Sequence, residues 1–186
     1  LNMGLTAEAV AKAYDVSRAA QDAFSLSSHQ KALHAIQQGH FKNGIVPITV
    51  KEVYLDENGK KQERSFVVDT DEGVRADTSL ESLSSLKPAF AVNGSVTAGN
   101  SSQNSDGAAF VVVMGETMVK ELGLQPLGRL VHCAVAGVHP KLMGIGPVEA
   151  IPKLLKGVNM RLEDIDLIEL NEAFAAQAIA VINSLG

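Results

Sequence analysis

The sequence predicts an α/β protein, because short apolar segments of strand length alternate with longer helical segments in its second half. Residues 110–114, 129–136 and 165–170 are expected to be buried strands, and a helical segment follows each of them. Alternation of this kind is typical of a parallel sheet. Hydrophobic residues make up 46% of the 186 residues, which is enough for a packed core and excludes a disordered chain.

The first forty residues are predicted to be helical. Thr6 is expected to cap a first helix, and Ser17 a second one that ends near Gln38. Gly39 then suits the C-terminal end, because glycine readily adopts the left-handed conformation found there.

A β-hairpin is predicted next. Residues 45–55 and 64–68 have the composition of strands, and the Asn-Gly pair within residues 56–59 favours a turn between them. Residues 69–79 are polar and expected to form a loop, and residues 79–86 a short helix.

Residues 94–109, which read GSVTAGNSSQNSDGAA, form a loop of small residues. Such a loop lets a ligand approach the backbone closely, although an ordinary flexible connector has the same composition. Helices are predicted over residues 116–122, from the MGIGP sequence at 143–147 to Gly157, and over 171–184.

Asn171 marks the abrupt end of the apolar segment 165–170. Its side chain can cap the following helix, or it can point its amide into a site, because ligands bind at the carboxyl ends of strands in α/β sheets.

Composition restricts the partners. The net charge is −5 with no basic cluster, so nucleic acid is not expected to bind. The single cysteine, Cys133, excludes a disulfide within the chain and a cysteine-cluster metal site, and no metal or bound cofactor is expected. No signal peptide or long apolar run is evident, which favours a cytoplasmic protein without membrane insertion.

The residues alone do not name a reaction. Cys133 lies among apolar neighbours, which favours a buried small hydrophobe over a nucleophile. No nucleophile elbow, phosphate-binding glycine motif or zinc-protease motif occurs.

Five segments, in order, resemble the thiolase family, and most closely its degradative 3-ketoacyl-CoA thiolases (acetyl-CoA C-acyltransferases). They are the helical start at residues 2–32, LKPAF at 86–90, the small-residue loop at 94–109, GVHPKLMGIGP at 137–147 and NEAFA at 171–175. The resemblance implies thiolytic cleavage of 3-ketoacyl-CoA by CoA in fatty-acid β-oxidation, through an acyl-cysteine.

The resemblance also implies how the chain is divided. Residues 1–104 would belong to the inserted CoA-binding loop domain, residues 105–125 to the last strand and helix of the N-terminal half, and residues 126–186 to the start of the C-terminal half. The βαβ layers of both halves would then be incomplete, and the chain is interpreted as an internal fragment. The complete protein would form a homodimer or homotetramer, and a missing targeting end would leave the peroxisome or mitochondrion as alternatives to the cytoplasm.

By resemblance, five residues would surround the reacting thioester. Asn171 would hold a water that, with a histidine, forms an oxyanion hole. Ala173 and Phe174 would shape the pocket beside it, and Met3 and Met143 would line the tunnel for the acyl group and the pantetheine.

Four further residues match positions that contact CoA. Arg75 would meet the nucleotide end and Phe90 would pack on the adenine or pantetheine, although a solvated loop arginine and a plain core phenylalanine are the alternatives. Ala98 and Ser102 would meet the pantetheine amides. Asn2 replaces the histidine that often precedes the methionine in the synthetic branch, which favours the degradative branch.

The family's nucleophilic cysteine, catalytic histidine and second cysteine have no counterpart in the sequence, and neither Cys133 nor His139 matches their positions. The 186-residue chain by itself is therefore predicted to be inactive. The alternative is a non-catalytic CoA-binding module.

Overall fold

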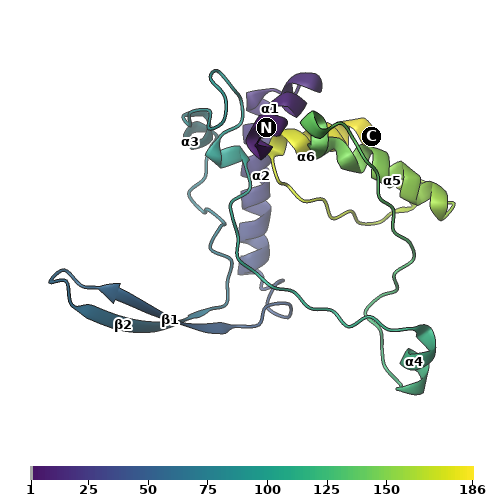
Figure 1. Ribbon diagram of the computed structural model, residues 1–186, viewed down its shortest axis with the longest axis horizontal. Helices are drawn as coiled ribbons and strands as arrows, with labels where there is room; N and C mark the ends of the chain where they lie inside the picture. The colour runs from purple at the N-terminus through teal and green to yellow at the C-terminus, as the bar shows by residue number, and fades with distance from the viewer. Residues whose placement is uncertain (1) are drawn as a thin grey trace.

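The computed structural model describes residues 2–186, and most of its helices gather into one packed group, with α4 lying apart from it (Figure 1). The elements of this group are α1 (Met3–Ala13), α2 (Arg18–Gln37), α3 (Leu80–Ser84), η1 (Ala98–Asn100), η2 (Pro140–Ile145), α5 (Gly146–Gly157) and α6 (Ala175–Leu185). The remaining elements are β1 (Ile48–Leu55), β2 (Lys61–Val68), α4 (Glu116–Glu121) and η3 (Leu162–Asp164).

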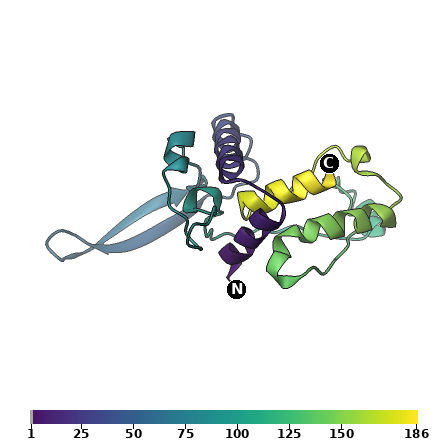
Figure 2. The same cartoon turned by 90° about the horizontal axis from the view of Figure 1, so that it is seen from above.

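The core lies where α1, η2 and α6 meet. Val10, Val16 and Ala180 form its buried centre. Ala176 and Ala178 of α6 are also fully buried, and these small side chains allow the neighbouring helices to approach closely. Figure 2 shows α6 lying beside α1 and α5, which agrees with its contacts to both helices.

The predicted N-cap of the first helix is wrong, whereas the predicted N-cap of the second helix is confirmed. The first helix begins at Met3 and not after Thr6, because the Oδ1 of Asn2 accepts a hydrogen bond from the backbone N of Leu5 at 2.9 Å. Ser17 caps α2 as predicted, through its Oγ and the backbone N of Ala20 at 3.2 Å. Gly39 follows that helix with a φ of +73°, also as predicted.

The predicted hairpin is confirmed and projects from the helical group (Figure 1). β1 and β2 pair in antiparallel register from Ile48 opposite Val68 to Leu55 opposite Lys61. The guanidinium of Arg64 lies 5.6 Å from the ring centroids of Tyr54 and Phe66, so it covers one face of the ribbon.

One carboxylate adds to the backbone hydrogen bonds of the hairpin turn. The side chain of Asp56 accepts hydrogen bonds from the Nε2 of Gln62 and from the backbone N–H groups of Lys60 and Asn58. These hydrogen bonds lower the pKa of Asp56 below its ordinary value of 3.8. The hydrogen bond from Gln62 contributes most, followed by the one from the backbone of Lys60.

We expect the side-chain hydrogen bonds of this turn to be weakened in acid. Because the pKa of Asp56 is lowered in the folded state, the charged carboxylate stabilises the turn above the unfolded pKa of about 3.9, and this stabilisation disappears as the pH falls through the folded value. Carboxyl chemical shifts measured by NMR between neutral and acid pH should give a midpoint for Asp56 below 3.8. A midpoint at or above that value would contradict the hydrogen-bonded turn.

The three strands predicted in the second half do not form, and this is the main correction to the sequence-based expectation. Residues 110–114, 129–136 and 165–170 adopt no strand structure, and no parallel sheet occurs within residues 2–186. Most of their apolar side chains are exposed, with Phe110 at 94% and Leu167 at 88%. A strand needs a partner for its backbone hydrogen bonds, and none of these segments lies against another in the described chain.

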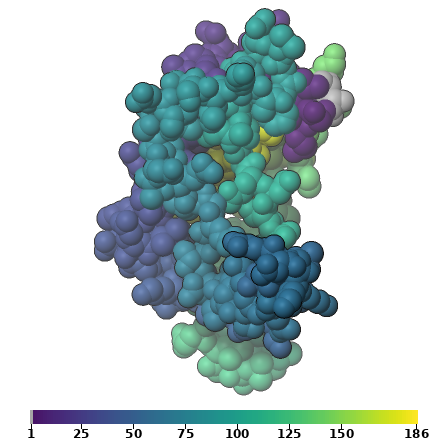
Figure 3. Space-filling model, turned by 90° about the vertical axis from the view of Figure 1, so that its left-hand side faces the viewer, coloured from purple at the N-terminus to yellow at the C-terminus, as the bar shows by residue number. Residues whose placement is uncertain are grey.

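The hairpin and α4 lie at the end of the molecule away from α1 (Figure 3). Long connections on both sides of α4 carry the chain out from the helical group and back to η2 (Figure 1). Within residues 2–186, no helix is long and apolar enough to cross a membrane.

The last helix begins later than predicted, at Ala175 and not at Asn171. Phe174 is its N-cap and makes no side-chain capping hydrogen bond. Asn171 is therefore not the cap of this helix, and the other interpretation, in which its amide points into a site, stays a prediction.

Candidate functional site

Two cavities meet at Asn171, and Leu170 and Ala173 also border both of them. We call the smaller one, of about 510 Å³, the methionine cavity. Its lining residues are Met3, Thr6, Ala7, Met143, Gly144, Pro147, Glu169, Leu170, Asn171, Ala173, Phe174 and Gln177.

The larger one, of about 760 Å³, is called the serine cavity. It is lined by Phe24, Ser25, Ser28, His29, Asp71, Gly73, Val74, Gly99, Asn100, Ser101, Ser102, Gln103, Ser105, Leu170, Asn171, Glu172, Ala173 and Ala175. Ser28 donates a hydrogen bond to the carboxylate of Glu172 at 2.5 Å, which links α2 to the segment before α6.

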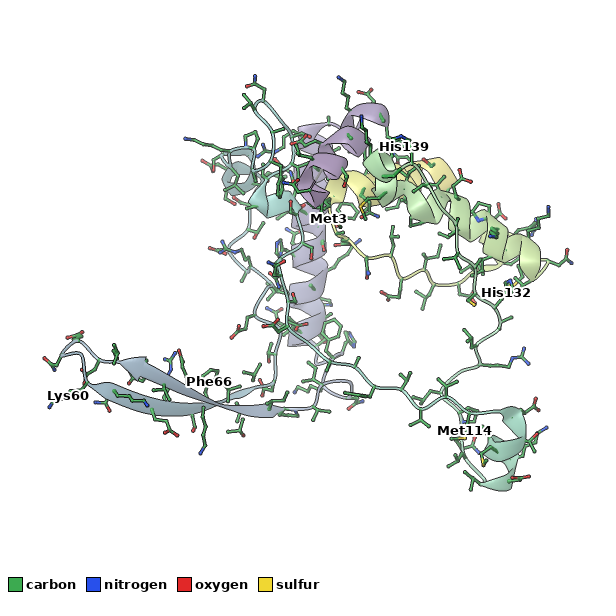
Figure 4. All side chains as sticks on the ribbon, viewed as in Figure 1. Met3, Lys60, Phe66, Met114, His132 and His139 are labelled. Carbon is green, nitrogen blue, oxygen red and sulfur yellow. The ribbon has the colours of Figure 1, made fainter. Side chains whose placement is uncertain are left out.

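The methionine cavity brings together five residues that the sequence placed around the thioester. Met3 comes from α1, Met143 from η2, and Asn171, Ala173 and Phe174 from the segment before α6. In Figure 4, Met3 lies within the helical group, far from Met114 beside α4. A carboxamide is thus placed in a wall that is otherwise largely apolar.

Phe90 supports this wall and does not line either cavity. Its ring lies 6.1 Å from the ring of Phe174, at an interplanar angle of 81°, which is an edge-to-face contact. Gly4 makes room for it, since a Cβ at that position would lie 2.1 Å from the Cγ of Phe90. The close approach of α1 to Phe90 therefore requires a glycine.

A short backbone pairing fixes Ser102 beside Ala173. Ser101 and Phe174 form an isolated antiparallel bridge, and the backbone N of Ser102 donates to the carbonyl O of Ala173 at 2.9 Å. The small-residue loop is thereby joined to the segment that carries Asn171, and Ser102 lies in the wall of the serine cavity.

A buried polar network joins the small-residue loop to α2. This network was not predicted from the sequence. The carboxylate of Asp22 accepts from the Nε of Arg18 at 2.7 Å and from the Nδ2 of Asn100 at 3.1 Å. The Oδ1 of Asn100 accepts in turn from the backbone N of Thr97 at 2.8 Å. The spacing of Arg18 and Asp22, four residues apart on α2, was the available sequence signal.

Glu8 is a second anchor that the sequence did not reveal. Its carboxylate accepts hydrogen bonds from the backbone N of Ser95 and of Val96, at 3.0 and 2.9 Å. A carboxylate that accepts several backbone N–H groups makes strong, charge-assisted bonds, so Glu8 ties α1 to the start of the loop.

Arg75 and Ala98 are not brought into either cavity. Arg75 is exposed, and its backbone N donates to the Nδ1 of His29 at 3.3 Å. Ala98 is exposed at the start of η1. Their contacts with CoA, like that of Phe90, remain predictions.

Cys133 and His139 lie outside both cavities as well. Cys133 is exposed, contrary to the buried position expected from its apolar neighbours. His139 accepts a hydrogen bond from the backbone N of Lys141 at 3.2 Å and so caps η2 (Figure 4). Among residues 2–186, no three His, Cys, Asp or Glu side chains are grouped to hold a metal ion.

Comparison with known structures defines the class of fold. The protein is similar to the crystal structure of the acetyl-CoA acetyltransferase of Bacillus anthracis, with a TM-score of 0.92 and 50% sequence identity over 100% of this chain and 45% of that one. It is also similar to the acetyl-CoA acetyltransferase of Syntrophomonas wolfei, with a TM-score of 0.82 and 38% identity over 99% of this chain and 44% of that one. The fold is therefore that of the thiolases, as predicted, although its central strands are unpaired here.

The chain belongs to the thiolase family. The model of the thiolase N-terminal domain matches residues 1–117, and that of the thiolase C-terminal domain matches residues 124–186. The predicted resemblance is thus confirmed.

Curated relatives agree with this assignment. The 3-ketoacyl-CoA thiolase of Bacillus subtilis is 55% identical over 100% of this chain and 48% of that protein. The peroxisomal 3-ketoacyl-CoA thiolase B of Rattus norvegicus is 49% identical over 99% of this chain and 42% of that protein. The chain therefore spans about half the length of these relatives.

Proposed function

We propose that the complete gene product is a degradative thiolase that cleaves 3-ketoacyl-CoA with CoA to give acetyl-CoA and a shortened acyl-CoA. The observation that carries this proposal is the methionine cavity, in which Met3, Met143, Asn171 and Phe174 converge from distant parts of the sequence. The relatives at 55% and 49% identity are named 3-ketoacyl-CoA thiolases, which supports the degradative reaction. Asn2, in place of the histidine of the synthetic branch, agrees with it.

Asn171 has the chemistry that thioester cleavage requires. Negative charge develops on the thioester oxygen when a thiolate attacks the carbonyl carbon. The amide of Asn171 would hold a water as a fixed donor toward that oxygen, so no reorganisation is needed as the charge develops. Met3, Met143 and Phe174 would place apolar side chains beside this hydrogen bond.

Coenzyme A would be a substrate, and no bound cofactor is needed. The serine cavity, at about 760 Å³, has the size of a small-molecule site, and Ser102 and Gly99 lie in its wall. Ser102, with Ala98 nearby, would meet the pantetheine amides, and Arg75 would meet the nucleotide end. Ala173 would shape the pocket between the two cavities.

The proposal is tested by a thiolysis assay. The purified complete gene product, given acetoacetyl-CoA and CoA, should consume the substrate and form acetyl-CoA. Binding of CoA without any turnover would favour the alternative, a non-catalytic CoA-binding module.

The 186-residue chain alone is expected to show no thiolysis of acetoacetyl-CoA, because it offers no match to the family's catalytic cysteines and histidine. Exposed apolar side chains such as Phe110, Val111 and Leu130 should also make it oligomerise or aggregate when expressed alone. An enzyme assay with acetoacetyl-CoA tests the absence of thiolysis, and light scattering tests the self-association. Measurable turnover that disappears on Cys133→Ala would contradict the assignment of catalysis to residues outside this chain.

Assembly and location complete the proposal. We expect the complete gene product to be a homodimer or homotetramer in the cytoplasm, which light scattering and cell fractionation would test. The similar proteins include bacterial and peroxisomal ones, so fractionation is needed to choose the compartment.

A further inference from the structure

One hydrogen bond joins the loop that carries Arg75 to α2. We call residues 69–78 the Arg75 loop. The backbone N of Arg75 donates to the Nδ1 of His29, which is half-buried on α2, at 3.3 Å. Within residues 2–186, no other hydrogen bond connects the Arg75 loop to the helical group. The acceptor on His29 therefore fixes where this loop meets α2.

The Arg75 loop also forms part of the wall of the serine cavity. Gly73 and Val74 are half-buried and line this cavity together with His29 and Gln103. The carboxamide of Gln103 occupies the space beside Gly73, since a Cβ at that position would lie 1.7 Å from the Nε2 of Gln103. The segment that leads directly to Arg75 is thus packed against the cavity, while Arg75 itself is exposed.

The guanidinium of Arg75 is available for an anionic ligand. Three other arginines form ion pairs with carboxylates, whereas the guanidinium of Arg75 makes no ion pair with the other residues of the described chain, 2–186. In CoA, only the nucleotide end carries phosphate groups, and a guanidinium is a strong hydrogen-bond donor to phosphate. The charge of Arg75 therefore suits the nucleotide end and not the neutral pantetheine arm.

The position of the Arg75 loop should control how well this charge is used. If a binding group is held in place for only a fraction of the time, the apparent affinity for the ligand falls by that fraction. The net effect of one hydrogen bond on such an equilibrium is about three- to tenfold. The acceptor on His29 is thus expected to affect CoA binding although it does not itself contact the ligand.

We propose that His29 is a positioning residue for CoA binding. Its Nδ1 holds the Arg75 loop against α2, and this places the guanidinium of Arg75 to bind the phosphates of the nucleotide end. Because His29 acts through Arg75, binding of the pantetheine arm does not depend on it. This inference rests on the proposed function, since it takes CoA as the ligand and Arg75 as its nucleotide contact.

The test compares His29→Asn with His29→Leu in the complete gene product by isothermal calorimetry. Asparagine and leucine have a similar size and branch at the same atom, but only asparagine offers an acceptor where the Nδ1 of histidine lies. The dissociation constant for CoA should rise about three- to tenfold in His29→Leu and stay within about twofold in His29→Asn. Leucine has the higher helix propensity, so weaker binding by His29→Leu would not come from unfolding of α2.

His34→Leu is the matched control. His34 is an exposed histidine on the same helix, and it lines neither cavity. Its replacement should leave the affinity for CoA within about twofold.

Pantetheine, which lacks the phosphates, provides a second arm. Its dissociation constant should stay within about twofold in both His29 variants, because the interaction that His29 supports is absent from this ligand. In steady-state thiolysis, His29→Leu should raise KM for CoA, with kcat changed by less than about twofold, since ground-state binding is what is lost.

Arg75→Ala tests whether the effect passes through the guanidinium. This substitution should weaken CoA binding about tenfold, because a charge-assisted contact to phosphate is lost. In the Arg75→Ala background, His29→Leu should change the affinity for CoA by less than about twofold, since the group that His29 positions is already gone.

The outcomes separate the two proposals. Absence of both CoA binding and thiolysis in the unsubstituted protein would overturn the proposed function and this inference together. Equal affinities for CoA in His29→Leu and His29→Asn, or an equal loss of CoA and pantetheine binding in His29→Leu, would overturn this inference alone. Weaker binding of CoA only in His29→Leu, and no further loss in the Arg75→Ala background, would support it.

Discussion

Replacing Asn171 with alanine in the complete gene product is expected to lower kcat for thiolysis by about 10²–10³, which is the usual loss when one oxyanion-hole donor is removed. The expectation follows from the place of Asn171 at the junction of both cavities, beside Met3 and Met143. KM should change little, since the donor acts mainly on the charge of the transition state. Steady-state kinetics with acetoacetyl-CoA measure both constants.

Asn183→Ala, on the exposed face of α6, is the control for this substitution and should retain full activity. A fall in kcat/KM that comes only from a raised KM would assign Asn171 to ground-state binding and would contradict its proposed part in the oxyanion hole.

Replacing Asp22 with alanine is expected to destabilise the protein by about 1–3 kcal/mol, because the Nε of Arg18 loses its acceptor, while its Nη2 keeps the hydrogen bonds to the carbonyl O atoms of Leu83 and Leu86. The side chain of Asp22 is 5% exposed and that of Arg18 is 25% exposed. The substitution also removes the acceptor for Asn100, whose amide is bonded to Asp22 in the interior. Urea-induced unfolding gives the free energy of unfolding for comparison.

The exposed pair on α4 provides a matched control. Glu116 and Lys120 have the same spacing as Arg18 and Asp22, but their side chains are 76% and 73% exposed. Glu116→Ala should therefore change the free energy of unfolding by about 0–1 kcal/mol. Similar losses for Asp22→Ala and Glu116→Ala would contradict the view that the buried network holds the loop.

Local signals predicted the elements that are local in the sequence. The Ser17 cap, the glycine after α2 and the Asn-Gly turn of the hairpin depend on neighbouring residues, and all are present. The start of α1 was misplaced because Asn2 and Thr6 are both suitable caps, and only the hydrogen bond from Leu5 distinguishes them.

The strands predicted at 110–114, 129–136 and 165–170 depend on partners that sequence patterns do not supply. Apolar composition predicted burial, but burial in a sheet requires adjacent strands, and these segments remain unpaired and exposed. The fold class was still predictable, since the order of helices and apolar segments is that of the family.

Resemblance to the family identified the residues that converge on the methionine cavity, because their motifs are short and contiguous. It did not reveal Glu8 or Asp22. Each of these is a common polar residue on a helix, and its role depends on a distant group that only the folded chain brings near.

A crystal structure of the complete gene product with acetyl-CoA tests the account most directly. We expect the thioester to lie in the methionine cavity between Met3 and Met143, with its carbonyl oxygen one water away from the amide of Asn171. A thioester bound outside this cavity, with Asn171 unengaged, would contradict the assignment.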